Sequence, residues 1–440
     1  MEQAIIEQNS WWKDKENLLS DEKIATALNK NPPLVYNFED YSNNLFIGPR
    51  QVGKTTFFKL LIYDLLFNKR INPKEVCYFS CELLKNFKDL IELFRKFSVL
   101  ANPKYIFLDE ISFVEDWHRA VKYLLDSGLL KGKILYLTGS SSVELKKERF
   151  PGRGINIKYF LPLSFRKFAF LFGSEKLKTK MKDLKISEFR NLKEIYEKSK
   201  ELFTFEDELE KLFFIYLQAG GFPRAFYEMM EEGRIKSETY EIYWNWLLND
   251  IAKLGRSEKI AISILEGILK NYGVKFSLNS IAKEMEIGSH VTVREYLEIF
   301  ENLLAVRNVH FFDFNKKMVI FRKMRKVYFI DPFILHTINF RIYGTKYEDF
   351  PKMVEGLVTE SLIRKFGSLK LGFYTNRKEI DVAFNNFGIE VKWQEKVTSE
   401  DFPKTFIKNK IIISKKDFDF VKDENLLILP ASLFLALVDV

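Results

Sequence analysis

A phosphate-binding loop is the first chemical signature in the chain. Residues 48–55 read Gly-Pro-Arg-Gln-Val-Gly-Lys-Thr and fit G-x-x-x-x-G-K-[ST], with a short apolar run before them and a helical pattern after them. The backbone amides of such a loop and the N-terminus of the following helix favour phosphate. We expect Lys54 to reach the β- and γ-phosphates of ATP and the Thr55 hydroxyl to ligate Mg²⁺. The predicted nucleotide-binding residues are Gly48, Pro49, Arg50, Gln51, Val52, Gly53, Lys54, Thr55 and Thr56.

Two carboxylates follow a second apolar run. Residues 105–108 read Tyr-Ile-Phe-Leu and end in Asp109 and Glu110. Ligands of open α/β sheets bind at the carboxyl ends of the strands, so we expect Asp109 to hold the Mg²⁺ shell. Glu110 is then expected to orient and deprotonate the attacking water.

A run of serines follows the next apolar segment, residues 134–137. The sequence after it, Thr-Gly-Ser-Ser-Ser, could place a hydroxyl beside the γ-phosphate, and Ser140 is the preferred candidate. An ordinary polar loop is the alternative, because such clusters commonly mark loops.

A second carboxylate constellation lies near the C-terminus. Asp381, followed by Glu390-Val391-Lys392, fits the D-(x)n-E-x-K pattern of restriction-endonuclease-like nucleases. In a strand Glu390 and Lys392 point to the same face, and Asp381 on a neighbouring strand can meet them. The carboxylates could hold Mg²⁺ and the lysine could activate water, with Glu355 or, less favourably, Glu360 completing the set. The alternative is a solvated charged strand.

The elements that must position these residues form several parts. Four short apolar runs, near residues 44–47, 76–79, 105–108 and 134–137, alternate with helical patterns and predict a parallel α/β sheet. Lys/Glu-rich helical segments follow from about residue 174. Residues 277–304 predict a helix-turn-helix, and residues 306–330 are rich in strand formers, as in a winged helix. The acidic second helix, with Glu295, Glu298 and Glu301, favours a structural role over DNA contact.

Composition limits the classes of protein. The chain has 440 residues, 47% of them hydrophobic, and a net charge of +9, which favours a polyanionic partner such as DNA. Two cysteines and four scattered histidines build no disulfide framework or metal pattern. The N-terminus lacks a signal-peptide pattern, and the longest apolar stretch, residues 426–438, is too short to cross a membrane. We expect a cytoplasmic protein with no membrane association, its N-terminal segment held onto the first domain by Trp11 and Trp12.

Several motifs together resemble the prokaryotic, mostly archaeal, AAA-type ATPases that carry a C-terminal domain of unknown function. The residues that carry the resemblance are Gly48–Thr56, Phe107–Ile111, Trp117, Thr138–Ser141, Pro151–Arg153, Pro162–Arg166, Gly220–Pro223 and Tyr328–Pro332.

The resemblance implies a fold class and a division into domains. The fold is α/β, with an AAA-type P-loop core at 1–172, a helical lid at 173–250, a winged helix at 251–334 and a C-terminal α/β restriction-endonuclease-like domain at 335–440. It further implies that Arg153, or else Arg149, senses the γ-phosphate or reaches a neighbouring subunit of a homo-oligomer. Arg224 would act from the lid. The alternative for these arginines is pairing with surface carboxylates.

Two functions remain open at this point. The first is a Mg²⁺-dependent ATPase whose nucleotide cycle controls a nuclease-like domain acting on DNA. The second is a regulatory ATP switch that gates protein–protein contacts through an inactive nuclease-like domain.

Overall fold

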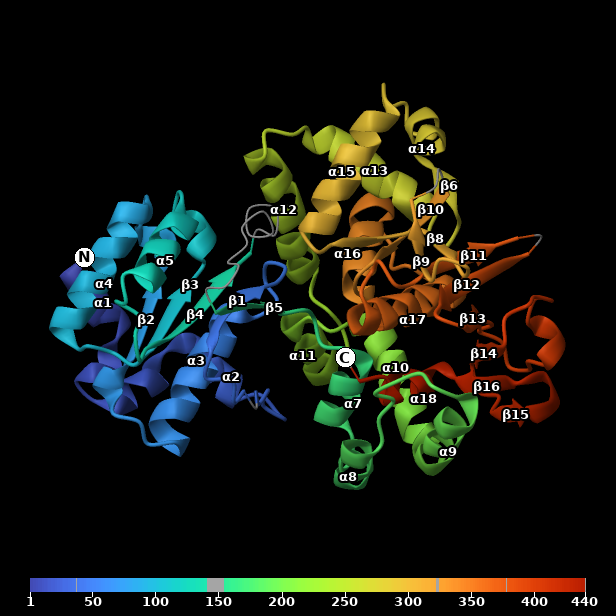
Figure 1. Cartoon of the computed structure of the whole chain (residues 1–440), viewed down its shortest axis with the longest axis horizontal. Coiled ribbons are helices and arrows are strands. Elements are labelled where there is room, and N and C mark those ends of the chain that lie inside the picture. The colour runs from blue at the N-terminus through green and yellow to red at the C-terminus, as the bar shows by residue number, and fades with distance from the viewer. Residues whose placement is uncertain (37, 141–153, 322–323, 377, 440) are drawn as a thin grey trace. The chain divides into compact units, whose positions relative to one another are not determined.

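The computed structural model describes residues 1–36, 38–140, 154–321, 324–376 and 378–439 (Figure 1). The chain divides into two compact units, Met1–Leu161 and Pro162–Val440. The four-part division expected from the sequence stays a prediction.

A five-stranded parallel sheet organises the first unit. Its strands are β1 (Asn43–Ile47), β2 (Val76–Ser80), β3 (Tyr105–Asp109), β4 (Ile134–Gly139) and β5 (Ile155–Tyr159). They lie in the order β2-β3-β4-β1-β5. The predicted parallel α/β sheet is confirmed, and β5 adds an edge strand that the apolar runs did not indicate. Because β1 and β3 are neighbours of β4, their C-terminal ends lie close together.

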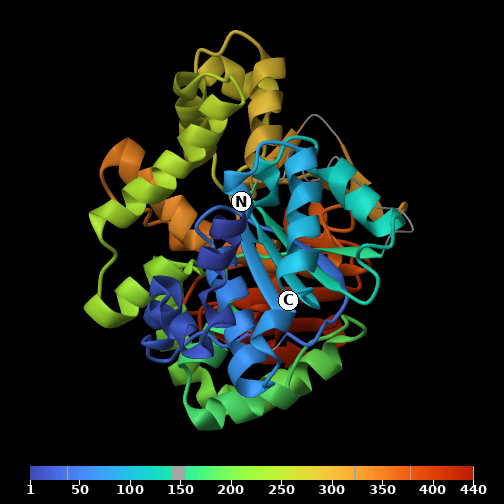
Figure 2. The same ribbon diagram turned by 90° about the vertical axis from the view of Figure 1, so that its left-hand side faces the viewer.

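Helices cover both faces of this sheet (Figures 1 and 2). They are α1 (Glu2–Gln8), α2 (Glu22–Leu28), α3 (Lys54–Tyr63), α4 (Phe87–Leu100) and α5 (Trp117–Asp126). One core against the sheet is aromatic: Phe57 and Phe58 of α3 pack against Phe46 and Phe107 of the strands, and Phe107 packs against Tyr136. This packing fixes α3, and therefore the loop before it, to the sheet.

The N-terminal segment covers the open edge of β2. The indole N–H groups of Trp11 and Trp12 both donate to the carbonyl of Val76, at 3.1 and 2.9 Å. The side chain of Asn9 accepts from the N–H of Tyr78 at 2.7 Å and donates to its carbonyl at 2.8 Å. These bonds replace a neighbouring strand, so the predicted attachment through Trp11 and Trp12 is confirmed.

The second unit begins with helices. They are α7 (Phe165–Phe172), α8 (Glu175–Asp183), α9 (Leu192–Leu202), α10 (Glu206–Ala219), α11 (Pro223–Glu232) and α12 (Ser237–Lys253). Next come α13 (Glu258–Lys270), β6 (Phe276–Ser277), α14 (Leu278–Glu284), α15 (His290–Asn302), β7 (Val306–Val309) and β10 (Met324–Phe329). The last three strands named form an antiparallel sheet in the order β6-β10-β7. This sequence of elements is compatible with the predicted winged helix.

A mixed eight-stranded sheet completes the second unit, in the order β15-β16-β14-β13-β12-β11-β8-β9. Its strands are β8 (Phe311–Asp313), β9 (Met318–Ile320), β11 (Gly372–Thr375), β12 (Glu379–Phe384), β13 (Phe387–Val391), β14 (Asn409–Ser414), β15 (Asp419–Val421) and β16 (Leu426–Pro430). The remaining helices are α16 (Pro332–Tyr343), α17 (Phe350–Phe366) and α18 (Ala431–Leu437). Since β8 and β9 join this sheet, residues on either side of position 334 share one structural unit.

Membrane crossing has no support in the described ranges, where every helix is too short or too polar to span a bilayer.

Candidate functional site

The loop between β1 and α3 has the backbone that phosphate binding requires. Gly53, just before α3, has a φ of 96°, in the left-handed region that glycine adopts without strain. A Cβ added to Gly48 would lie 2.1 Å from the carbonyl oxygen of Phe160, so only glycine fits there. The loop therefore approaches β5 closely and leads its backbone into the N-terminus of α3.

Lys54 is the first residue of α3, directly after this loop. The residue is 4% exposed, and its ammonium donates to the carbonyls of Gly48 at 3.1 Å and Pro49 at 2.9 Å. The ammonium is also 3.9 Å from Oε1 of Glu110. Lys54 and Glu110 thus belong to one cluster, as is required if both act on the same bound nucleotide.

Asp109 collects hydroxyl groups at the end of β3. Its Oδ2 accepts from Thr55 Oγ1 at 2.6 Å and from the Tyr78 hydroxyl at 2.9 Å, and its Oδ1 accepts from Thr138 Oγ1. The two residues predicted to hold Mg²⁺ are therefore in direct contact. A carboxylate and a hydroxyl are hard oxygen ligands of the kind that Mg²⁺ prefers, and the other partners of Asp109 are neutral, so these residues fit the ion.

Sequence reasoning missed Tyr78 and gave Thr138 no role, although Thr138 begins the Thr-Gly-Ser-Ser-Ser run from which Ser140 was chosen. Burial, followed by the charge of Asp109, raises the pKa of Tyr78, so its hydroxyl stays a donor. The signal for Tyr78 was position alone, because it lies on a strand that flanks β3.

Glu110 is held in an unusual backbone conformation. Its φ is 53°, in the left-handed region that is strained for a residue with a side chain. Its N–H donates to Thr138 Oγ1 at 2.9 Å, and Ser140 Oγ donates to its Oε1 at 2.5 Å. Its Oε2 is buried with no hydrogen-bond partner among the described residues. The structure thus brings Ser140 to Glu110, and one carboxylate oxygen remains available for a further donor such as water.

The predicted arginines are not joined to this cluster by any described contact. Arg149 and Arg153 lie outside the described residues. Arg224 is in the first turn of α11, in the other unit. Their roles stay predictions.

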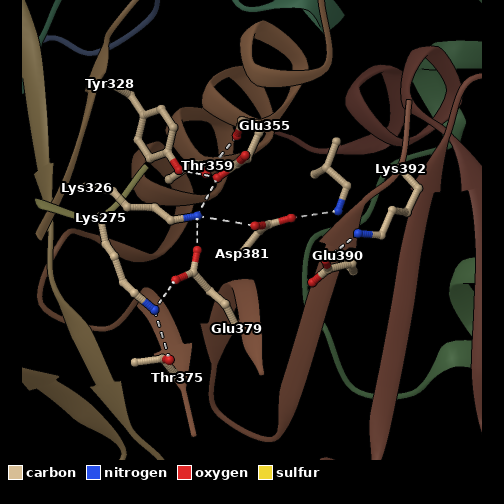
Figure 3. Close-up of polar contacts among 11 residues, drawn as sticks. Lys275, Lys326, Tyr328, Glu355, Thr359, Thr375, Glu379, Asp381, Glu390 and Lys392 are labelled. Carbon is tan, nitrogen blue, oxygen red and sulfur yellow. Dashed lines mark hydrogen bonds and ion pairs between the residues drawn. The ribbon is translucent and has the colours of Figure 1, made fainter. Parts of the chain in front are cut away.

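The C-terminal constellation is built by a hairpin and a helix (Figure 3). Strands β12 and β13 pair antiparallel with Val382 opposite Ile389, and the same register continued by one residue puts Asp381 opposite Glu390. Glu355 reaches the cluster from α17. The predicted residues therefore come from adjacent elements, as the strand alternation required.

A buried lysine that sequence reasoning missed lies among these carboxylates. Lys326, on β10, is 1% exposed. Its ammonium is 2.7 Å from Glu355 Oε1, 2.8 Å from Glu379 Oε1 and 3.2 Å from Asp381 Oδ1. The Tyr328 hydroxyl also donates to Glu355 Oε1. Burial disfavours the charge of Lys326, but Tyr328 and the surrounding carboxylates outweigh it and raise the pKa of the lysine, which therefore stays charged.

Glu390 has a separate environment. Its Oε1 is 2.8 Å from Lys392 Nζ, while its buried Oε2 has no hydrogen-bond partner among the described residues. The second oxygen of Asp381 accepts from the N–H of Val391 at 3.0 Å. Burial and the nearby charge of Asp381 raise the pKa of Glu390 to about 8, and the same two causes raise the pKa of Glu355 to about 7.

The predicted Mg²⁺ set at this second site does not fit an ion in this arrangement. Asp381 and Glu355 converge on Lys326, whereas Glu390 pairs with Lys392. Within the described ranges no group of three His, Cys, Asp or Glu residues is arranged to hold a metal. Glu360, the less favoured helix acid, pairs instead with Arg307 and Arg364, both at 2.8 Å.

Three of the motifs that carry the family resemblance meet in one hydrogen-bonded junction. Asp331 accepts from the N–H groups of Gly221 at 2.8 Å and Phe333 at 2.9 Å. Gly221 accepts from the N–H of Leu163 at 2.9 Å. Burial raises the pKa of Asp331 to about 7. These contacts give the motifs a structural role that joins three distant segments of the second unit.

Comparisons with known proteins match two segments of the chain. A family model described as an AAA domain matches residues 41–169, which include the P-loop, Asp109, Glu110 and Ser140. A model described as a domain of unknown function (DUF8612) matches residues 210–342. Neither match assigns a winged helix or a nuclease-like domain.

Two curated relatives cover most of the chain. An uncharacterized protein of Methanocaldococcus jannaschii is 29% identical over 355 residues, which are 78% of this chain and 71% of that protein. An uncharacterized protein of Haemophilus influenzae is 26% identical over 351 residues, which are 76% of this chain and 77% of that protein. Their names assign no activity.

Solved structures give weaker likenesses. The RuvB Holliday junction branch migration motor of Thermotoga maritima is 17% identical, covers 67% of this chain and 89% of its own, and has a TM-score of 0.26. AMPPCP-bound DnaA from Aquifex aeolicus is 14% identical, covers 65% of this chain and 88% of its own, and has a TM-score of 0.22. Scores this low carry no argument about the present chain. The AAA-domain match and the geometry of its P-loop support an AAA-type ATPase.

Proposed function

We propose that the chain is a Mg²⁺-dependent ATPase of the AAA type. The observation that carries the proposal is the contact between Thr55 Oγ1 and Asp109 Oδ2, at 2.6 Å, beside a loop that holds Lys54. Three separate sequence signals meet in one cluster there. The AAA-domain match over residues 41–169 supports the same function.

Each residue of the cluster has a part in hydrolysis. The loop amides and Lys54 bind the phosphates, and Thr55 and Asp109 hold Mg²⁺, which supplies charge neutralisation on the phosphates when bound. Lys54 then exchanges its present carbonyl acceptors for phosphate oxygens. Glu110 accepts the proton of the attacking water through its unpartnered Oε2, while Ser140 fixes the other oxygen of that carboxylate.

Two substitutions test the ATPase proposal. Lys54→Ala should lose nucleotide binding, measured by calorimetry with a non-hydrolysable ATP analogue, because the phosphates lose their buried cation. Lys88→Ala, an exposed lysine on α4, is the matched control and should bind like wild type. Wild-type ATP hydrolysis by Lys54→Ala would refute the proposal.

We propose that the cycle of ATP binding and hydrolysis in the first unit controls the activity of the second unit. In one version it cleaves DNA, which the position of Asp381, Glu390 and Lys392 on or next to one hairpin and the net charge of +9 support. In the other it is a catalytically inactive nuclease-like domain that gates protein contacts. The ammonium of Lys326 among the carboxylates favours this second version.

A single assay separates the two versions. Single- and double-stranded DNA are incubated with the full chain and Mg²⁺ or Mn²⁺, with and without ATP. The gating version predicts no cleavage under any of these conditions. Cleavage that disappears in Asp381→Asn would establish the nuclease version.

The finer roles of the arginines and the assembly belong to the same proposal. If Arg153 reaches a neighbouring subunit, the ATPase works as a homo-oligomer in the cytoplasm, and mixing Arg153→Ala with Glu110→Gln chains restores part of the activity. Arg224 acts from its own chain, so mixing does not rescue its substitution.

A further inference from the structure

The ammonium of Lys326 is saturated by carboxylates. A lysine ammonium has three N–H donors, and three carboxylate oxygens lie within 3.2 Å of this one, from Glu355, Glu379 and Asp381 (Figure 3). The acceptors come from α17 and β12, while the lysine comes from β10 of a different sheet. The tertiary fold, and no local motif, creates this arrangement.

Burial makes the lysine and the carboxylates depend on each other. Lys326 is 1% exposed and Glu355 is 9% exposed, so water hydrates neither charged group to a significant degree. A buried charge without a counter-charge is strongly disfavoured. Of these three carboxylates, Glu379 alone has a second cation within ion-pair distance among the described residues: Lys275 lies 2.9 Å from its other oxygen at the edge of the cluster.

We propose that Lys326 is the resident cation of this cluster and occupies the place of the divalent ion that a nuclease-like site would hold. The inference rests on the proposed assignment of Asp381 and Glu390 to the site of the second unit. While Lys326 is present, the site takes no Mg²⁺ or Mn²⁺.

The remaining oxygen atoms explain why an ion cannot simply join the lysine. Asp381 Oδ2 is used by the N–H of Val391, and Glu390 Oε1 is used by Lys392. A divalent ion needs several oxygen ligands at roughly 2.0–2.6 Å. An ion placed among these carboxylates would also be repelled by the nearby positive charge of the ammonium. The Oε2 atom of Glu390 is buried and has no hydrogen-bond partner among the described residues. Removal of the ammonium would free oxygens of three carboxylates beside it.

The experiment measures Mn²⁺ binding to the nucleotide-free full chain by electron paramagnetic resonance. Wild type should show no bound ion that depends on Asp381. Lys326→Met keeps an unbranched apolar stem without the charge, and it should gain one bound Mn²⁺ that the second substitution Asp381→Asn removes. Lys275→Met is the matched control, because it contacts the same Glu379 from the edge and should create no site.

Two results would overturn the inference. One is a Mn²⁺ ion in the wild-type chain that Asp381→Asn removes. The other is a folded Lys326→Met chain that binds no additional ion. If Lys326→Met is too unstable to isolate, Mn²⁺ binding is compared between the wild-type chain and Asp381→Asn, and an ion lost in Asp381→Asn would still refute the inference. Lys326→Arg, which keeps the positive charge, should likewise bind no ion that depends on Asp381. ATP hydrolysis is measured on the same samples and depends on the first unit. A failure of the proposed ATPase function is therefore distinguished from a failure of this inference.

Discussion

The two carboxylate clusters of this chain solve the same electrostatic problem in different ways. Asp109 is surrounded by hydroxyl groups of Thr55, Tyr78 and Thr138, which stabilise its negative charge without cancelling it. Asp381 is paired with the buried ammonium of Lys326, which offsets part of the negative charge that Asp381 shares with Glu355 and Glu379. Neutral donors orient a carboxylate and leave its negative charge available to a bound metal ion. A cation of the protein itself already pairs with the carboxylate and competes with such an ion. Carboxylates at strand ends are therefore not sufficient to indicate a metal site; the charge of their partners decides.

The largest effect should follow from Glu110→Gln. Loss of the proposed base should lower the ATPase rate by about 10²- to 10⁴-fold and leave ATP binding in place. Steady-state hydrolysis and equilibrium nucleotide binding are measured together. Glu92→Gln, on the exposed face of α4, is the control and should behave as wild type. An unchanged rate in Glu110→Gln would remove Glu110 from the mechanism.

Next in size is the stability effect of Lys326→Met. Three carboxylates then lose their buried cation, and the free energy of unfolding at pH 7 should fall by about 3–5 kcal/mol. Denaturant titration of the full chain measures the change. The loss should shrink at lower pH, where the carboxylates take up protons. Lys275→Met, at the exposed edge, should cost about 1 kcal/mol or less. Equal effects of the two substitutions would contradict a special role for Lys326.

A smaller effect should appear in the pH dependence of the second unit. The pKa of Glu390 is raised to about 8, so its carboxylate resists ionisation in the folded chain more than in the unfolded chain. A raised folded pKa contributes stability that is present below the unfolded value and is lost as pH rises. Glu390→Gln should therefore remove part of the fall in stability between pH 5 and 8, up to about 3 kcal/mol. Identical pH profiles for wild type and Glu390→Gln would show that Glu390 does not titrate in this interval.

The smallest effect belongs to Tyr78→Phe. Asp109 loses one of three hydroxyl donors, which should cost about 0.5–1.5 kcal/mol and raise the Mg²⁺ concentration that half-saturates the ATPase by a few-fold. The rate at saturating Mg²⁺ should stay close to wild type, a result that a general packing defect would not give. A fall in the saturated rate with unchanged Mg²⁺ dependence would instead place Tyr78 outside the ion's surroundings.

Local motifs made the first site predictable and the second only partly so. Lys54 and Thr55 are fixed by one contiguous pattern, and Asp109 and Glu110 follow an apolar strand whose end lies at the ligand-binding edge of a parallel sheet. Tyr78 and Thr138 enter the site through strand pairing, which no single segment encodes.

Long-range packing explains the remaining differences. Lys326 reaches Asp381 from a strand of another sheet, and a lysine in a β-rich segment reads as a solvent-exposed residue until that packing is known. The edge strand β5 alternates hydrophobic residues with Asn156 and Lys158 and is fully buried at no position, so it gave no continuous apolar run. Strand β8 joins the C-terminal sheet by pairing with the distant strand β11, and β9 joins it through its hairpin pairing with β8.

Counting the divalent ions on the wild-type chain tests the comparison most directly. The full chain is saturated with a non-hydrolysable ATP analogue and titrated with Mn²⁺, and the bound ions are counted by electron paramagnetic resonance. The account predicts one ion per chain, lost in the double variant Thr55→Ala and Asp109→Asn and unchanged in Asp381→Asn. A second ion that Asp381→Asn removes, or no ion dependent on Thr55 and Asp109, would contradict it.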